Sequence, residues 1–321
     1  MLRSGTRTLD VLSGLCLVLL MGGATAGAED KTLIEWRFDK EGDFRGWSGF
    51  GMIADAAVRG GALHGRPTGN DPILVGPVFE IPARPLQYVE ICLKGTAPAV
   101  AELYWTETLQ GPYGGFNPAK HRLFHTEGDG QFHVYRIWPF WHAAKKIIRF
   151  RVDPPNEGEF DIQWIRIAER DSAAASEAKR WDRDEIRKLW RASGDLEGTP
   201  ESPIVFSPLV SLPAAENPFV CVRMATEGAG SGRLFCVSSS QFGGDSIAFP
   251  LRPDGKMHSY NIATGPMKKW RDEVILLGLQ VPAGEKANTR VESIEVAAEP
   301  RGPAELEAGY FGPSEGINRA G

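Results

Sequence analysis

Short apolar stretches, many with an apolar residue at every second position, follow one another along residues 31–169. The clearest are residues 33–38, 88–93, 101–105, 133–138, 147–152 and 162–167. Clusters of Gly, Pro, Asn and Asp separate them, and no amphipathic helical pattern interrupts the series. Because alternate residues of a strand point to opposite sides of a sheet, the pattern predicts an all-β sandwich or jelly roll around one shared core.

The chain carries this pattern twice. One set of residues recurs 125 positions later with its spacing unchanged: Phe124, Asp129, Gly130, His133, Tyr135 and Ile137 are matched by Phe249, Asp254, Gly255, His258, Tyr260 and Ile262. A second match pairs residues 72–83 with residues 203–214. Two matches in the same order predict a duplicated domain, not a solenoid, whose repeats would be about 20 to 50 residues long.

Residues 171–189 break the strand pattern, because alanines, Trp181, Ile186 and Leu189 alternate there with charged residues. This composition predicts a linker helix. We therefore predict two tandem, duplicated jelly-roll β-sandwiches, residues 29–170 and 190–299, joined by a helical linker. The second is predicted to be degenerate, since almost nothing in it matches residues 48–71. Residues 300–321 resemble a Gly/Pro-rich linker, which suggests that the chain is a fragment of a larger protein.

Residues 1–28 have the layout of a signal peptide. Arg3 and Arg7 precede a short apolar run, and small residues follow it. The run is too short for a membrane span, which takes about 20 apolar residues, and Leu15 before Cys16 does not fit a lipoprotein signal. We predict a secreted protein, extracellular or periplasmic, with no membrane contact after cleavage. The net charge of −5 and the lack of a basic stripe argue against a nucleic-acid partner.

Cys221 and Cys236 lie in two predicted strands on either side of a Gly-rich loop. If these strands form a hairpin, the two residues are opposite, with Cα atoms about 4.5 to 5.5 Å apart, a separation that a disulfide can bridge. A disulfide and a pair of small buried hydrophobic residues both fit the sequence. Cys92 has no evident partner, and the absence of CxxC spacing argues against zinc.

The repeated residues His133 and His258 are candidates for catalysis. Catalytic residues seldom persist in both halves of a duplication, however, so we interpret the two histidines as satisfied core residues. The Asp-Gly pair before each is interpreted as a turn that enters the strand.

Two loops of the first copy hold candidate ligand-binding residues: Tyr113, Phe116 and Asn117 in the first, and Trp138, Trp141 and His142 in the second. Sugar rings stack on aromatic planes, while their hydroxyl groups need polar partners. The matching loops of the second copy lack most of these aromatic residues, so we predict a polysaccharide or glycan ligand on the first copy. In the alternative interpretation, Trp138 and Trp141 cover the core or seal the contact between the sandwiches.

The segment from Trp36 to Asp39, followed by Gly42, Gly46 and Trp47, and the later segment 160–165 resemble the two ends of carbohydrate-binding modules with the galactose-binding-like jelly-roll fold. Such modules accompany extracellular glycoside hydrolases. The resemblance implies a structural Ca²⁺ in the first copy, bound by Asp39 and Asp161, with Glu41 or Asp43 and backbone carbonyls. Exposed carboxylates in turns are the alternative.

These observations lead to a secreted, non-catalytic carbohydrate-binding or accessory region. One alternative is a polysaccharide hydrolase or lyase with its site between the sandwiches, although the sequence offers no recognisable pair of carboxylates. Another is a purely structural module that packs beside a missing catalytic domain.

Overall fold

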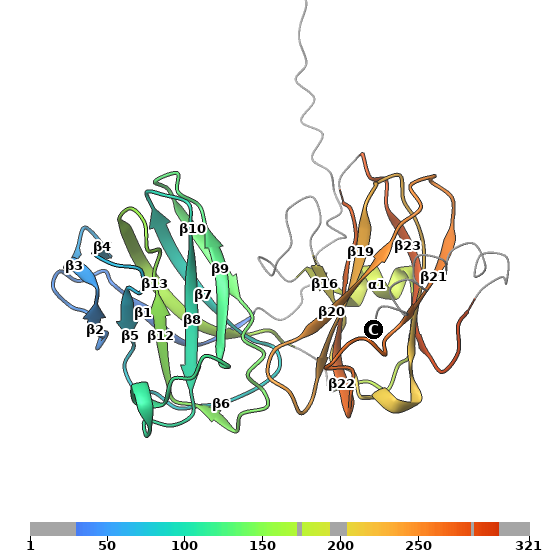
Figure 1. The fold of residues 1–321 in the computed structure, drawn as a ribbon, viewed down its shortest axis with the longest axis horizontal. Coiled ribbons are helices and arrows are strands. Elements are labelled where there is room, and N and C mark those ends of the chain that lie inside the picture. The colour runs from blue at the N-terminus through green and yellow to red at the C-terminus, as the bar shows by residue number, and fades with distance from the viewer. Residues whose placement is uncertain (1–29, 172–174, 193–203, 284–285, 302–321) are drawn as a thin grey trace, which may run out of the picture.

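The structure is a computed structural model that describes residues 30–171, 175–192, 204–283 and 286–301. It is almost entirely β-structure, arranged as two sandwiches side by side (Figure 1). The fold class predicted from the sequence is confirmed. No helix in the described ranges is both long enough and apolar enough to cross a membrane.

The first sandwich has two main antiparallel sheets. Its strands are β1 (Lys31–Arg37), β2 (Ser48–Gly51), β3 (Ile53–Arg59), β4 (Ala62–Pro67), β5 (Ile73–Val75), β6 (Ile81–Pro82), β7 (Gln87–Gly95), β8 (Ala99–Thr106), β9 (His121–Thr126), β10 (Phe132–Ile137), β11 (Lys146–Ile147), β12 (Arg149–Asp153) and β13 (Phe160–Glu169). One sheet has the order β10-β7-β13-β4-β3, with β1 also paired to β13, and the other has the order β2-β5-β12-β8-β9. The short strands β6 and β11 pair with each other.

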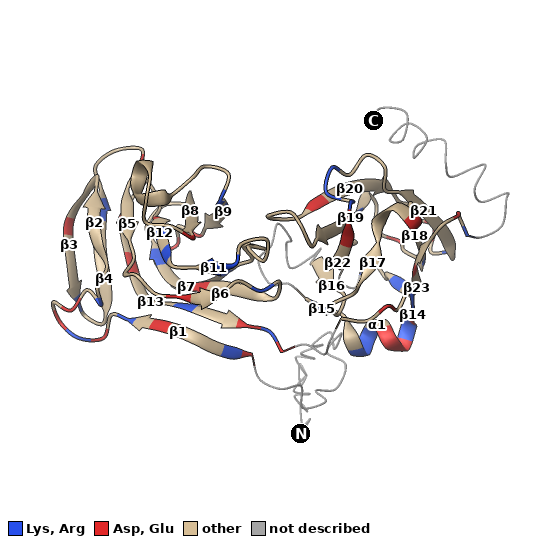
Figure 2. Cartoon of the chain, turned by 90° about the horizontal axis from the view of Figure 1, so that it is seen from below, with Lys and Arg blue, Asp and Glu red and all other residues tan. Residues whose placement is uncertain are grey.

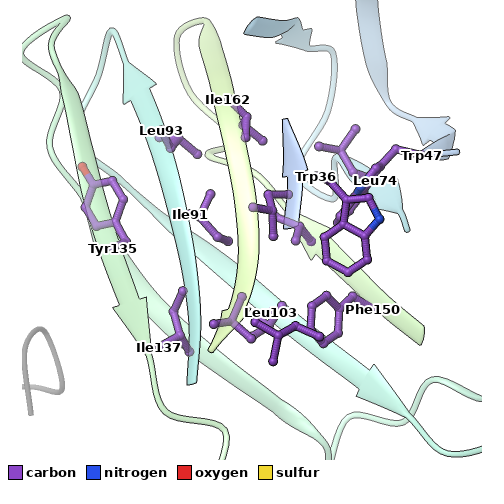
Figure 3. Close-up of a cluster of buried hydrophobic side chains, with 14 of the residues drawn as sticks. Trp36, Trp47, Leu74, Ile91, Leu93, Leu103, Tyr135, Ile137, Phe150 and Ile162 are labelled. Atoms are coloured by element: carbon purple, nitrogen blue, oxygen red, sulfur yellow. The ribbon is translucent and has the colours of Figure 1, made fainter. Parts of the chain in front are cut away.

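Alternate residues of these strands fill one core between the two sheets. Figure 3 shows Ile91 and Ile162 from one sheet and Leu103 and Phe150 from the other pointing into it, with Trp36 closing the same cluster. Trp36 contacts Trp47 edge to face, with ring centroids 5.8 Å apart. The aromatic residues that mark the start of the domain in the sequence are therefore core residues.

The second sandwich repeats this plan. Its elements are β14 (Arg180–Asp182), α1 (Arg183–Leu189), β15 (Arg191–Ala192), β16 (Ile204–Phe206), β17 (Leu212–Pro213), β18 (Phe219–Ala225), β19 (Ser231–Ser238), β20 (Asp245–Pro250), β21 (His258–Ala263), β22 (Glu273–Gln280) and β23 (Arg290–Ala297). The sheet β14-β23-β18-β21 corresponds to β1-β13-β7-β10, and β16-β22-β19-β20 corresponds to β5-β12-β8-β9. Within its described residues, no hairpin corresponds to β3 and β4, in line with the missing match to residues 48–71.

The repeated tyrosines occupy the same place in both copies. The hydroxyl oxygen of Tyr135 accepts a hydrogen bond from a backbone N–H eight residues earlier at 2.8 Å, and Tyr260 does the same at 3.2 Å. Each ring packs against the repeated phenylalanine, Phe124 or Phe249, with centroids 5.6 and 5.7 Å apart. The repeat thus preserves a packing unit of the sandwich.

The repeated Asp and His residues form a turn clamp. Asp129 Oδ1 accepts hydrogen bonds from the backbone N–H of Gln131 at 2.9 Å and from His133 Nε2 at 3.0 Å, and these bonds hold the pKa of Asp129 below its ordinary value. Asp254 and His258 form the same contact at 2.9 Å. Both histidines hold their turns, but only His258 is buried, whereas His133 stays partly exposed near the start of β10, on the same side of the strand as Tyr135 and Ile137.

The helix between the sandwiches is shorter than predicted. The segment 180–182 forms β14, which pairs with β23, and α1 spans only Arg183–Leu189. The carboxylate of Asp182 accepts hydrogen bonds from the N–H groups of Asp184 and Glu185, a capping box that fixes the start of the helix. Trp181 and Trp190 pack on each other within the second core, with centroids 5.6 Å apart. Residues 180–192 thus belong to the second sandwich, while residues 172–174 lie outside the described residues.

The predicted hairpin around Cys221 and Cys236 is wrong. Strand β18 pairs with β21 and β23, whereas β19 pairs with β20 and β22, so the loop between β18 and β19 crosses from one sheet to the other. The two residues are buried thiols on opposite sheets, with no disulfide between them. A Gly-rich loop marks a turn in the chain, but it does not determine whether the next strand joins the same sheet.

Candidate functional site

Trp141 is not a ligand-binding residue in this structure. Its side chain is fully buried in the first core and stacks on Phe150 with ring centroids 5.7 Å apart. Its indole Nε1–H donates a hydrogen bond to Gln87 Oε1 at 2.7 Å. The sequence-based prediction is wrong for this residue because its ring faces and its polar group all have protein partners.

Trp138 is fully buried as well, at the contact between the two sandwiches. It stacks on Phe140 and meets Phe206 of the second sandwich edge to face, with ring centroids 5.7 Å apart. The guanidinium of Arg170 lies over its ring at 4.8 Å. The prediction of ligand binding is wrong here too, and the alternative, that Trp138 seals the contact between the copies, fits the structure.

The other four predicted residues do not share one site. Tyr113 is 82% exposed, on a short 3-10 turn at Pro112–Gly115, whereas Phe116 is buried. Asn117 Oδ1 accepts a hydrogen bond from the backbone N–H of Ala119 at 2.8 Å, which shapes its own loop. His142 Nε2 donates to the carbonyl oxygen of Ser238 in the second sandwich at 2.7 Å, and burial lowers the pKa of its imidazole. Ligand binding by Tyr113 stays a prediction.

The four predicted calcium ligands do not form a donor set. Asp39 pairs with Arg45 at 2.6 Å, and Asp43 also lies beside Arg45 at 3.5 Å. Asp161 contacts Lys94 at 2.6 Å and His64 at 3.0 Å, while Glu41 is exposed. Among the described residues, no three His, Cys, Asp or Glu side chains lie close enough to hold a metal ion. The residues present therefore do not fit a calcium site.

A different group of functional side chains lies on the outer face of the β5-β12-β8-β9 sheet. In register, Val75 is beside Arg151, Arg151 beside Tyr104, and Tyr104 beside His121. Because the neighbours of Tyr104 and Arg151 along their strands, such as Leu103 and Phe150, point into the core, this row points outward. We call the outer side chains of these four strands the tyrosine face.

The row is held by stacking and by hydrogen bonds. The ring of Tyr104 stacks on His121 with centroids 5.2 Å apart, and the guanidinium of Arg151 lies over the same ring at 4.9 Å. The hydroxyl of Tyr104 donates to Glu102 Oε2 at 2.6 Å. Burial and this carboxylate raise the pKa of Tyr104. The three planar groups are thus held side by side, and all three are partly exposed.

Arg151 is surrounded by carboxylates. Its Nε and Nη2 each donate to Asp153 at 2.6 Å, and Nη2 also donates to Asp71 at 2.8 Å. Within the described residues, Nη1 makes no hydrogen bond. Burial raises the pKa of Asp153 to about 6, against the opposing effect of Arg151, and the charges of Asp71 and Glu102 act in the same direction as burial.

The second copy has lost this site. Register places Phe206, Gly278, Phe235 and Ser246 at the positions of Val75, Arg151, Tyr104 and His121. A Cβ on Gly278 would meet Phe206 and Phe235 at 3.0 Å, so glycine lets the two rings close over the strand.

These rings join an apolar cluster between the sandwiches. It combines Leu86, Tyr88, Trp138, Phe140 and Ala168 with Ile204, Phe206, Phe235, Val237 and Leu276. The face that stays polar in the first copy is therefore the docking surface in the second.

The titration of Asp153 leads to a pH prediction. Its pKa in the folded protein, about 6, lies above the ordinary aspartate value of 3.8. The stabilisation that its neutral form gives is therefore fully present below pH 4 and is lost as the pH rises through 6. Between pH 4 and 7, wild type should lose roughly 2 kcal/mol of unfolding free energy relative to Asp153→Asn. Urea unfolding of both proteins across this range measures the difference. A constant difference would place the pKa of Asp153 at its ordinary value.

No protein-family model and no curated protein matches the chain. Among solved structures, BiXyn10A CBM1 in its apo form is 12% identical, with a TM-score of 0.31, over 43% of this chain and 99% of that one. PBSX exported protein XepA is 12% identical over 76% and 85% of the two chains, with a TM-score of 0.22. PNGF-II is 10% identical over 82% and 65%, with a TM-score of 0.23. All three TM-scores are below 0.5, and none of these chains is more than 12% identical to this one.

Proposed function

We propose that the chain is a secreted, non-catalytic glycan-binding protein that holds a polysaccharide on the tyrosine face of its first sandwich. One observation carries the proposal. The row of His121, Tyr104 and Arg151 stays polar and partly exposed in the first copy, whereas the same row in the second copy is mostly apolar and buried against the first.

The chemistry of the row suits a polyhydroxylated ligand. Sugar hydroxyl groups both donate and accept hydrogen bonds, and here Arg151 Nη1 can donate while the carboxylates of Glu102 and Asp71 can accept. Leu123, 57% exposed beside Glu102, can pack against the apolar face of a sugar ring. Since the row lies on the face of a sheet, a stretch of polysaccharide chain suits it better than a small molecule.

The geometry supports binding over hydrolysis. Glu102 and Asp153 are opposite each other in register, and a raised carboxyl pKa is a feature of general acids. Both oxygens of Asp153 are held by Arg151, however, and its carboxyl group is almost wholly buried. A proton donor must reach the glycosidic oxygen, which favours a binding role for this pair.

The proposed location rests on the sequence. The predicted signal peptide, residues 1–28, lies outside the described residues, and a secreted binding module would meet polysaccharide in the periplasm or outside the cell. The proposal that a catalytic domain accompanies the two sandwiches rests on the resemblance at both ends of the first copy.

Binding tests distinguish the tyrosine face from the loop that carries Tyr113 as the place where polysaccharide binds. In affinity electrophoresis with arabinoxylan, glucomannan, mixed-linkage β-glucan and galactan, at least one polysaccharide should retard wild type. Tyr104→Ala and Arg151→Gln should each weaken that binding tenfold or more, a loss of about 1.4 kcal/mol. Tyr113→Ala is the matched control, since this exposed tyrosine lies outside the row, and it should bind as wild type does.

Other outcomes would decide against the proposal. Loss of binding in Tyr113→Ala, with binding retained in Tyr104→Ala, would return the site to the loop. No retardation of folded wild type by any of the polysaccharides would leave the purely structural module as the better account.

A further inference from the structure

The outer face of the other sheet in the first sandwich has a different chemistry. In register, Arg136 of β10 lies beside Glu90 of β7, Glu90 beside Arg166 of β13, and Arg166 beside Glu35 of β1. One row across four strands therefore alternates arginine and glutamate, and Figure 2 shows acidic and basic residues close together along β1. We call the outer side chains of β1, β13, β7 and β10 the arginine face.

Glu90 is the centre of this row and is only 3% exposed. Arg136 donates to Glu90 Oε1 from Nε at 2.8 Å and from Nη2 at 2.6 Å. Arg166 donates to Glu90 Oε2 at 2.5 Å. One buried carboxylate thus holds two guanidinium groups at the surface of the sheet.

Aromatic rings fix the guanidinium groups further. Trp164 contacts both Arg166 and Arg37, whose Cζ atoms are 4.8 and 5.9 Å from its ring centroid. Arg136 lies over Tyr88 at 4.3 Å. A cation over an aromatic ring is stabilised by the negative ring face. The arginines are therefore positioned before any ligand arrives, which lowers the entropic cost of binding.

The cations of this face are nearer to solvent than the carboxylates that they pair with. Arg37 is 52% exposed against 26% for Glu35, and Arg166 is 31% exposed against 3% for Glu90. Lys94 is likewise more exposed than Asp161, the carboxylate with which it pairs. At the rim of the tyrosine face the carboxylate is the more exposed partner instead: Asp71 is 60% exposed and Arg151 only 14%. On the arginine face it is thus the basic partner of these ion pairs that is the more exposed to solvent.

We propose that the arginine face is a second binding surface, for a linear anionic polysaccharide that carries carboxylate or sulfate groups. Guanidinium groups match the planar geometry of a carboxylate and bind oxyanions through several N–H donors. Arg136 and Arg166 lie on strands two spacings apart in the sheet, about 10 Å. Arg37 and Lys94 add cations on the neighbouring rows. An extended polymer with regularly spaced charges can contact several of them at once.

Polygalacturonate and heparin are the probes, because one carries carboxylates and the other also carries sulfates. Wild type, as the whole chain, should bind at least one of them at low ionic strength and be released by salt, since surface charges are screened by ions. The double variant Arg37→Gln/Lys94→Gln should bind at least tenfold more weakly. This variant leaves the contacts of Glu90 intact, so the sheet should keep its fold. Arg223→Gln is the control, because this residue forms an exposed ion pair with Glu292 in the second sandwich.

Three results would overturn the proposal: no binding of either probe by wild type, an equal loss in Arg223→Gln, or DNA of similar charge competing as well as the polysaccharides. Tyr104→Ala separates this surface from the tyrosine face. It should leave polyanion binding unchanged even if it abolishes the binding of neutral polysaccharide, so either proposal can fail without the other.

Discussion

Replacing Trp141 with alanine should destabilise the protein by about 3 to 5 kcal/mol, the usual cost of removing a large aromatic residue from a core. The ring is fully buried and packs on Phe150 and Trp105. The substitution also removes the indole N–H that donates to Gln87. Urea denaturation followed by circular dichroism gives the free energy of unfolding.

Tyr113→Ala is the control for this prediction, because it removes an exposed aromatic residue from the other predicted loop. It should change the free energy of unfolding by no more than about 0.5 kcal/mol. A Trp141→Ala protein as stable as wild type but unable to bind polysaccharide would contradict the structure and would make Trp141 a surface residue.

Phe140→Asp should separate the two sandwiches without unfolding either. Phe140 is fully buried between the copies, 5.8 Å from Phe206 and 5.6 Å from Phe235, and it lies outside both main cores. Its φ of 48° is in the left-handed region, which aspartate tolerates better than phenylalanine. The backbone should therefore accept the change, while the lost packing and the buried charge should cost the interface about 3 kcal/mol or more.

Small-angle scattering should show a larger radius of gyration for Phe140→Asp, with the β-sheet circular dichroism spectrum retained. Phe132→Asp is the matched control, since Phe132 is partly exposed on β10. An unchanged radius of gyration in Phe140→Asp would mean that the cluster between the sandwiches does not hold them together.

The duplication could be predicted because the repeated residues have local roles. Asp129 accepts a hydrogen bond from a backbone N–H two residues later, and Tyr135 accepts one from a backbone N–H eight residues earlier. Each bond forms only if the two residues keep this separation along the chain. The same holds for Asp254 and Tyr260 in the second copy. A structural unit that spans about a dozen residues leaves a pattern in the sequence that survives when other positions diverge.

The tyrosine face could not be predicted, because it depends on the order of strands in a sheet. The outward positions of Tyr104 and Arg151 follow from the alternation of polar and apolar residues in their strands. That β8 and β12 are neighbours, however, is decided by the whole sandwich. The crossing between β18 and β19, which separates Cys221 from Cys236, was missed for the same reason.

The aromatic loop at residues 138–142 was misassigned for a different physical reason. A loop whose tryptophan binds a sugar and a loop whose tryptophan seals an interface can have the same amino-acid composition. The difference lies in the partner surface, which here comes from Phe206 and Phe235 of the second copy. The sequence of a single loop does not contain that information.

The most direct test of the central claim follows the six histidines of the chain by proton NMR while a neutral oligosaccharide, cut from a polysaccharide that binds, is added. His121 and His125 lie on β9 at outward positions of the tyrosine face. The account predicts that His121 shifts, with or without His125, and saturates at one oligosaccharide per chain, while His64, His133, His142 and His258 stay unchanged. Shifts at those four histidines, with His121 unmoved, would contradict it.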